Sequence, residues 1–124
     1  MFLIIVIAAA IAAMWRMSVT QTATDNMSLQ QARAYQAAQA GIEWGIPSAL
    51  AGVCSEVNPP FTPGGFAELF LVHVSCSEEE GASDLPEERI QNVIFYTITS
   101  KAEYSSVGSA DYVYRQLAAV VEMP

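Results

Sequence analysis

Residues 1–15 read MFLIIVIAAAIAAMW, a run without a polar side chain, and the first charged residue is Arg16. Fifteen residues of α-helix span about 22 Å at 1.5 Å per residue, and a bilayer core needs roughly 20 residues. Met17 and Val19 lengthen the apolar run, because an arginine near the headgroups can extend its charge into water. The run therefore predicts a retained membrane anchor. The alternatives are a buried helix and a cleaved signal peptide, although a signal peptide needs a basic stretch before its apolar run.

The composition excludes several classes of function. Thirteen acidic and five basic residues among 124 give a formal charge of −8. Binding of nucleic acid or of anionic lipid headgroups needs clustered Lys and Arg, so we expect neither. Hydrophobic residues make up 52% of the chain, and their excess is concentrated in residues 1–15. A large enzyme, a polytopic transporter and a disordered tail do not fit this length and distribution.

The apolar run continues into a longer predicted helix. Between Ser18 and Ile46 the chain has no proline, and its first glycine is Gly41. We predict one helix over residues 2–46, which Pro47 ends or kinks, with residues 48–53 as a candidate further turn. The 71 residues after position 53 are too few to cover such a helix. Its first half therefore needs lipid or other helices around it.

The second half of the predicted helix carries a stripe of larger apolar side chains. They are Tyr35, Ile42 and Ile46, with Ala32 and Ala38 at the margins. We expect this stripe to face the rest of the chain.

Small residues form a second candidate packing surface on the same helix. Ala37, Gly41 and Gly45 make a small-xxx-small series, which lets another backbone approach closely. Either a sheet of the same chain packs here or a helix of another subunit does. Trp44 is expected to close one side of the packed face. In the apolar run, the corresponding pairs are Ala8 with Ala12 and Ala9 with Ala13.

Three strands are predicted after the helix. Residues 55–65 contain three prolines and two glycines, which is typical of a loop. The predicted strands, from alternation and from β-branched and aromatic content, are residues 66–76, 93–99 and 112–121. The acidic residues 77–86 and the polar residues 101–110 are predicted as a loop and a turn. The expected fold class is α+β, a long N-terminal helix packed on a small antiparallel sheet.

Two cysteines, Cys54 and Cys76, lie 22 positions apart. This spacing matches no common zinc motif, and two thiols alone make an incomplete metal site. A disulfide between them would fix the proline-rich loop, contribute about 3 kcal/mol and need an oxidising compartment. With a membrane anchor in front, we expect a periplasmic head with this disulfide. Two buried free thiols in a cytosolic protein are the alternative.

No residue pattern predicts catalysis, a metal site or a cofactor. His73 lies inside a predicted strand, three residues from Cys76 and hence on the opposite face, so a Cys–His dyad is not expected. No phosphate-binding loop and no Gly-x-Ser-x-Gly or His-Glu-x-x-His motif occurs. An acidic cluster could offer oxygen ligands to calcium, but it lacks the ligand spacing of an EF-hand, so we expect a solvated loop. The cluster comprises Glu78, Glu79, Glu80, Asp84, Glu87 and Glu88.

Residues 32–45, ARAYQAAQAGIEWG, resemble the Ala-x-Ala-Tyr-x-Ala-Ala-x-Ala-Gly-Ile-Glu-Trp-Gly segment of certain minor type IV pilins. These are the minor pilins of the mannose-sensitive haemagglutinin (MSHA) pilus, the MshP-like family, with PilX-like minor pilins as relatives. Further matches are VSC at 74–76, YTITS at 96–100 and YRQL at 114–117. Order and spacing agree over nearly the whole chain. The helix segment is fairly specific, whereas the strands alone would not identify a family.

The resemblance implies a non-enzymatic minor pilin that initiates or modulates pilus assembly. Residues 1–23 would be the transmembrane and assembly helix, and residues 24–124 the periplasmic pilin head. The implied partners are the inner membrane before assembly and other pilin subunits in the cell-surface pilus. The resemblance also implies a short basic leader, removed by a prepilin peptidase at the cytoplasmic face, and N-methylation of the new terminus.

Two departures from the major pilins refine this expectation. No Lys/Arg-Gly leader is present, so we expect a chain that is already processed or that begins at an internal start. Major pilins carry Glu at the fifth mature position, whereas Ile5 stands here and no carboxylate occurs before Asp25. A minor subunit is therefore expected. A pseudopilin of a type II secretion machine and a single-span periplasmic binding or sensor module are the alternatives.

Overall fold

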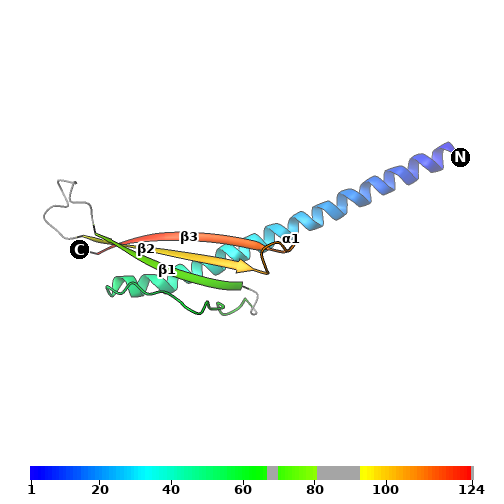
Figure 1. Ribbon diagram of the computed structural model, residues 1–124. Helices are drawn as coiled ribbons and strands as arrows, with labels where there is room; N and C mark the ends of the chain where they lie inside the picture. The colour runs from blue at the N-terminus through cyan, green and yellow to red at the C-terminus, as the bar shows by residue number, and fades with distance from the viewer. Residues whose placement is uncertain (67–69, 81–92, 124) are drawn as a thin grey trace. The chain divides into compact units, whose positions relative to one another are not determined.

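The predicted helix forms as one continuous element, α1, Phe2–Leu50 (Figure 1). The computed structural model describes residues 1–66, 70–80 and 93–123. Pro47 lies inside α1, and the helix continues for three residues beyond it. Gly52, with a φ of 75°, then closes a Schellman motif, in which its N–H donates to the Ala49 carbonyl and the Val53 N–H donates to the Ser48 carbonyl, both at 2.9 Å. Pro47 is thus tolerated in the last turn instead of ending the helix.

Three strands form one antiparallel sheet in the order β1-β2-β3. They are β1, Phe70–Glu80; β2, Ile94–Tyr104; and β3, Val113–Met123. Phe70 pairs with Tyr104 at one end of the first ladder, and Ile94 pairs with Met123 at the far end of the second. A long N-terminal helix packed on this sheet is the α+β arrangement of type IV pilins, which confirms the predicted fold class (Figure 1).

The strand boundaries differ from those predicted. β1 continues to Glu80, because Glu78–Glu80 pair with Tyr96, Phe95 and Ile94 of β2, so these acidic residues belong to a strand and not to a loop. β2 continues to Tyr104, so residues 101–104 are not part of the turn. β3 ends at Met123, two residues later than predicted. Positions 67–69 of the first predicted strand and 81–86 of the predicted acidic loop lie outside the described residues, as do positions 87–92.

Alternation along the strands separates a helix-facing side from an exposed side. Phe70, Val72 and Val74 of β1 are buried, whereas Leu71 and His73 between them are exposed. This alternation in β1 was predicted. The same alternation continues into the polar end of β2, where Ala102 is fully buried and Lys101 is exposed. The core of the described residues lies between this side of the sheet and residues 34–49 of α1.

The chain divides into two compact units, Met1–Gln30 and Gln31–Pro124, and each is described by itself. The first contains only helix. The second contains residues 31–50 of α1, the loop that follows and the sheet. Whether the membrane segment ends at residue 23 remains a prediction.

Candidate functional site

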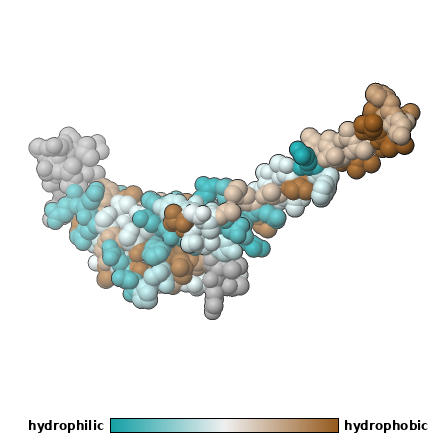
Figure 2. All heavy atoms as spheres, turned by 45° about the vertical axis from the view of Figure 1, so that its right-hand side comes forward, coloured by the Kyte–Doolittle hydropathy of each residue, from teal (hydrophilic) through white to brown (hydrophobic). Residues whose placement is uncertain are grey.

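The first unit exposes all of its large apolar side chains. Within residues 1–15 their exposed fractions run from 50% at Val6 to 101% at Met1. An 18-residue window near the N-terminus has a mean hydropathy of 2.2 and no buried residue, so α1 is long and apolar enough to cross a membrane. Figure 2 shows a mostly hydrophobic surface over this end of the helix. Ala9 and Ala13 are exposed within it, available to a neighbouring molecule.

The hydroxyl groups beyond the apolar run are satisfied by the helix itself. Thr20, Thr22 and Thr24 donate to the carbonyls four residues earlier, at 2.9–3.0 Å. Ser28 donates to the Asp25 carbonyl at 2.9 Å. Because these hydroxyls need no water, residues 20–28 can lie against a partner at a smaller desolvation cost than their composition suggests.

In the second unit, the small residues of α1 face the sheet. Ala37 and Gly41 are buried, and so is Gly45. A methyl group built on Gly41 would overlap Ser100 Oγ and lie 2.8 Å from Val72 Cγ1, and one on Gly45 would lie 2.7 Å from Ile98 Cγ2. Neither position has room for a side chain. The sequence left open whether a sheet of the same chain or a helix of another subunit packs on Ala37, Gly41 and Gly45. In the structure, the sheet of the same chain packs there.

The predicted stripe of larger side chains is wrong in part. Tyr35 is 50% exposed, and Ala32 is exposed as well, so this side of α1 faces away from the sheet. Ile42 and Ile46 are only partly buried at the margin of the core. The side of α1 that meets the sheet carries small residues throughout: Ala34, Ala37, Ala38, Gly41, Gly45 and Ala49. The spacing of alanine and glycine, rather than of large side chains, was the signal for it.

Trp44 lies beside this packed face, 44% exposed, with its ring centroid 6.4 Å from that of Phe61. Phe61 belongs to the loop after α1, which pairs with the outer edge of β1. The Phe61 and Val72 backbones exchange two hydrogen bonds of 3.1 and 2.8 Å, and the Val57 N–H donates to the Val74 carbonyl at 3.0 Å. The loop thus covers part of an edge strand that would otherwise offer free backbone groups.

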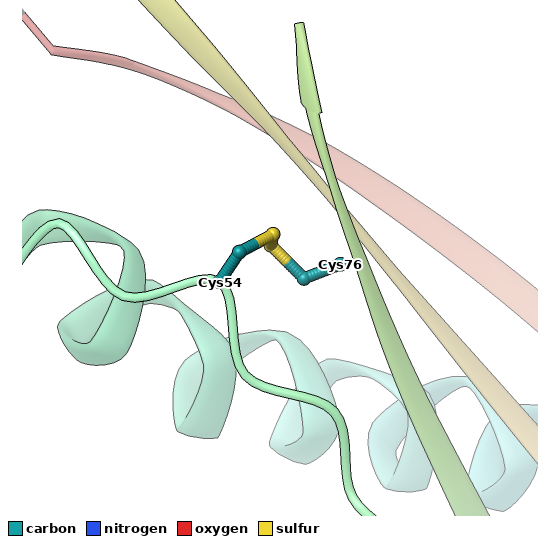
Figure 3. The surroundings of a disulfide bond; sticks show 2 residues. All are labelled: Cys54 and Cys76. Carbon is teal, nitrogen blue, oxygen red and sulfur yellow. A yellow bond between two sulfur atoms is a disulfide. The ribbon is translucent and has the colours of Figure 1, made fainter.

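A disulfide joins Cys54 to Cys76, with their Cα atoms 5.4 Å apart. Figure 3 shows it linking the segment that follows α1 to strand β1. The described residues contain no free cysteine. The bond fixes the start of the loop against the sheet, close to the C-terminal end of α1. The oxidising compartment that the sequence led us to expect is consistent with this pairing.

Within the described residues, His73 and Cys76 do not lie together as a reactive pair. His73 points to the exposed side of β1, opposite Lys101 of β2, whereas Cys76 lies on the helix-facing side. Desolvation of the phenol, and then the negative charge of Glu103, raise the pKa of Tyr112 above its ordinary value.

The acidic cluster is divided by the strand. Glu78 and Glu80 lie on one side of β1 and Glu79 on the other, because successive side chains alternate. Asp84, Glu87 and Glu88 lie outside the described residues. Among residues 1–66, 70–80 and 93–123, no group of three His, Cys, Asp or Glu side chains could hold a metal ion.

Comparison with protein-family models found no match, and neither the search of curated proteins nor that of solved structures found one.

Proposed function

We propose that this chain is a minor subunit of a type IV pilus, of the MshP-like kind, that initiates or modulates assembly of the fibre. One observation carries the proposal. A single helix begins with fourteen exposed apolar residues, 2–15, and its last twenty residues support a disulfide-bonded antiparallel sheet. Such a chain needs two environments, an apolar one around residues 1–15 and an oxidising aqueous one around the head.

During assembly, residues 1–15 would exchange the lipid around them for other apolar helices. Before assembly, the exposed surface of residues 1–15 lies in the inner membrane, where its burial is favourable. It leaves lipid at little cost only if other apolar helices replace the hydrocarbon, since transfer to water would expose the whole surface. A bundle of pilin helices at or near the fibre tip supplies this replacement.

The motif that carries the resemblance has a structural role in this chain, which supports the proposal. Gly41 and Gly45 within residues 32–45 let the sheet approach α1 closely, and Trp44 packs beside the loop. The segment therefore builds the head, and residues 1–30 are left for assembly. In residues 1–30 the side chains are exposed, apart from a partly buried Gln30.

The test is a charge placed within the apolar run. Ala9→Arg would put a cation where the helix must be surrounded by lipid or by neighbouring helices, a change that costs about 3 kcal/mol in a membrane. We expect the variant to be absent from sheared filaments, while its head keeps the disulfide, read as resistance of Cys54 and Cys76 to alkylation. Gln21→Arg, in the polar part of the same helix, is the matched control.

Each alternative gives a different result. Normal recovery of the Ala9→Arg chain in sheared filaments would refute the assembly role of residues 1–15. A native chain found only in membranes, and never in sheared filaments, would instead indicate a single-span binding or sensor module.

A further inference from the structure

The two edges of the sheet differ in how the chain covers them. The outer edge of β1 is covered, because the Phe61 and Val72 backbones pair and the Val57 N–H donates to the Val74 carbonyl. β3 forms the other margin (Figure 1), and no segment among the described residues pairs with its outer side. Along an edge strand every second residue directs its N–H and C=O outward, so this margin offers a row of free backbone groups.

β3 also lacks the features by which proteins protect an exposed edge. Its eleven residues pair with β2 without a bulge, and none of them is proline. Its only charged side chains, Arg115 and Glu122, stand near the two ends and leave six uncharged residues, QLAAVV at 116–121, between them. A long, regular and uncharged edge is a template for another strand.

The inner side of β3 is covered less than the inner side of β2, although the two strands are paired. At three successive inner pairs, the β2 residue is at most 4% exposed and its β3 partner is only partly buried. These pairs are Ser100 with Leu117, Ile98 with Ala119 and Tyr96 with Val121. The well-covered core therefore ends at β2, and the apolar side chains of β3 keep exposed surface.

The flank of α1 on the β3 side is also apolar and incompletely covered. Gln31 marks this flank, because its side-chain oxygen accepts a hydrogen bond of 3.1 Å from Arg115 of β3. At about 100° per residue, Tyr35, Ile42 and Ile46 lie within about 60° of Gln31 around the helix. Tyr35 is 50% exposed, and the two isoleucines are only partly buried. A strand added beside β3 would therefore meet apolar side chains of β3 and of α1, so its own inner side chains should be apolar.

The backbone and the charges of β3 together specify the chemistry of such a partner. Alternating free N–H and C=O groups along an edge are satisfied by another extended polypeptide segment. Arg115 stands near one end of this edge, where its guanidinium donates to the neutral amide of Gln31 and lies opposite Ala102 of β2. Because a guanidinium pairs most strongly with a carboxylate, the partner strand should carry Asp or Glu level with Arg115.

A second copy of this chain does not meet that requirement. When two β3 edges pair antiparallel with α1 of both copies on the same side, inner positions face inner positions. Arg115 then faces an uncharged side chain or another arginine, since the inner positions are Val113, Arg115, Leu117, Ala119, Val121 and Met123. The β1 edge of a second copy is covered by its own loop.

We propose that the free edge of β3 binds an extended segment of a different protein, which adds a fourth strand to the sheet. The side chains of this segment that face α1 are apolar, and an acidic residue lies level with Arg115. The proposal goes beyond the assembly role of residues 1–15 and does not depend on it, because the edge is equally free in a chain that never enters a fibre.

Photo-crosslinking of the full chain, in the cells that make it, tests the added strand. The photoreactive residue p-benzoylphenylalanine replaces Gln116, Ala118 or Val120, which are exposed on the side of β3 away from α1. Each chain should crosslink to the same protein, and the crosslinked site should shift by two residues for each step of two along β3, since paired strands advance together. The same photoreactive residue in place of Leu71, which is exposed on β1 beside the covered edge, should crosslink at least tenfold less.

Charge reversal at Arg115 gives a second, independent measurement. Arg115→Glu in the Val120-substituted chain should lower the crosslinking yield at least tenfold, whereas Arg115→Lys should retain most of it, because the positive charge remains. Lys101→Glu, an equal change of charge on the exposed side of β2, is the matched control and should leave the yield unchanged. Resistance of Cys54 and Cys76 to alkylation reports that each variant has folded.

Four results would overturn the proposal. A dimer of this chain as the main product would mean that a second copy occupies the edge. Equally low crosslinking from the β3 positions and from Leu71 would mean that the edge stays free. Partner sites that do not shift with the position on β3 would mean that the contact is not a paired strand, and an unchanged yield in Arg115→Glu would remove the acidic partner residue.

Discussion

Gly41 shows why the helix offers small residues to the sheet. The large side chains of the interface come from the strands, where Phe70, Val72 and Ile98 are almost fully buried. Because they fill the space, the facing side of α1 must carry little more than backbone. A reading based on large apolar residues therefore chose Tyr35, which is half exposed, whereas the alanine and glycine spacing at 37, 41 and 45 pointed to the packed side.

Gly41→Ala should destabilise the head. Its methyl group would overlap Ser100 Oγ and lie 2.8 Å from Val72 Cγ1. Overpacking of this kind costs about 1–3 kcal/mol, which exceeds the gain of about 1 kcal/mol from the better helix propensity of alanine. Thermal unfolding of the full chain in detergent should show a lower Tm. Gly64→Ala, at a glycine with no atom within 4 Å of the added methyl, is the matched control. An unchanged Tm for Gly41→Ala would mean that the helix lies further from the sheet.

Ser100→Ala should stabilise the head. Ser100 is fully buried, and its hydroxyl has no hydrogen-bond partner among the described residues. Removing a buried polar group that lacks a partner removes its desolvation cost, so we expect unfolding to require about 1 kcal/mol more. The measurement is urea unfolding of the full chain in detergent. A loss of stability would show that the hydroxyl makes a hydrogen bond in solution.

At the scale of elements, the helix was predictable and the strand ends were not. A proline-free stretch rich in helix formers predicts residues 2–46 of α1 from local sequence, whereas the continuation through Pro47 to Leu50 was not predicted. Strand ends depend on pairing, which a local reading does not contain. Glu78–Glu80 read as a loop because glutamate is poor in strands, yet their pairing with β2 keeps them in β1. The turn before β3 was likewise predicted to begin too early. Lys101 and Glu103 are polar and suggested a turn, but they lie on the exposed side of β2, and Ala102 between them is buried.

The disulfide between two elements gives a third prediction. Cys54→Ser with Cys76→Ser removes a link that closes a 22-residue separation. By the chain-entropy estimate the loss is about 3 kcal/mol, which is a large fraction of the stability of a small head. The Tm of the native chain should fall in reductant, and that of the double variant should be low with or without it. Equal melting of both chains under oxidising conditions would show that the bond contributes nothing.

At the scale of the whole molecule, the second unit has a hydrophobic core of its own and the first unit does not. The second has its own core, including Ile98, which is 1% exposed. The first has almost no buried residue, only a partly buried Gln30, so its stability as a helix depends on surroundings outside the chain. The apolar run predicted this dependence from the sequence. The molecules that surround residues 1–15 are not part of this chain, so neither its periodicity nor its composition identifies them.

Two tryptophans can report these surroundings separately. Trp15 ends the apolar run of the first unit and is 73% exposed, whereas Trp44 lies in the head. In vesicles, brominated acyl chains should quench the fluorescence of the Trp44→Phe chain, in which Trp15 remains, because an anchor places this residue at the edge of the hydrocarbon. The Trp15→Phe chain, in which Trp44 remains, should respond instead to a water-soluble quencher. Equal quenching of both chains by the brominated lipid would place the head in the membrane too, and quenching of neither would remove the anchor on which the proposed assembly depends.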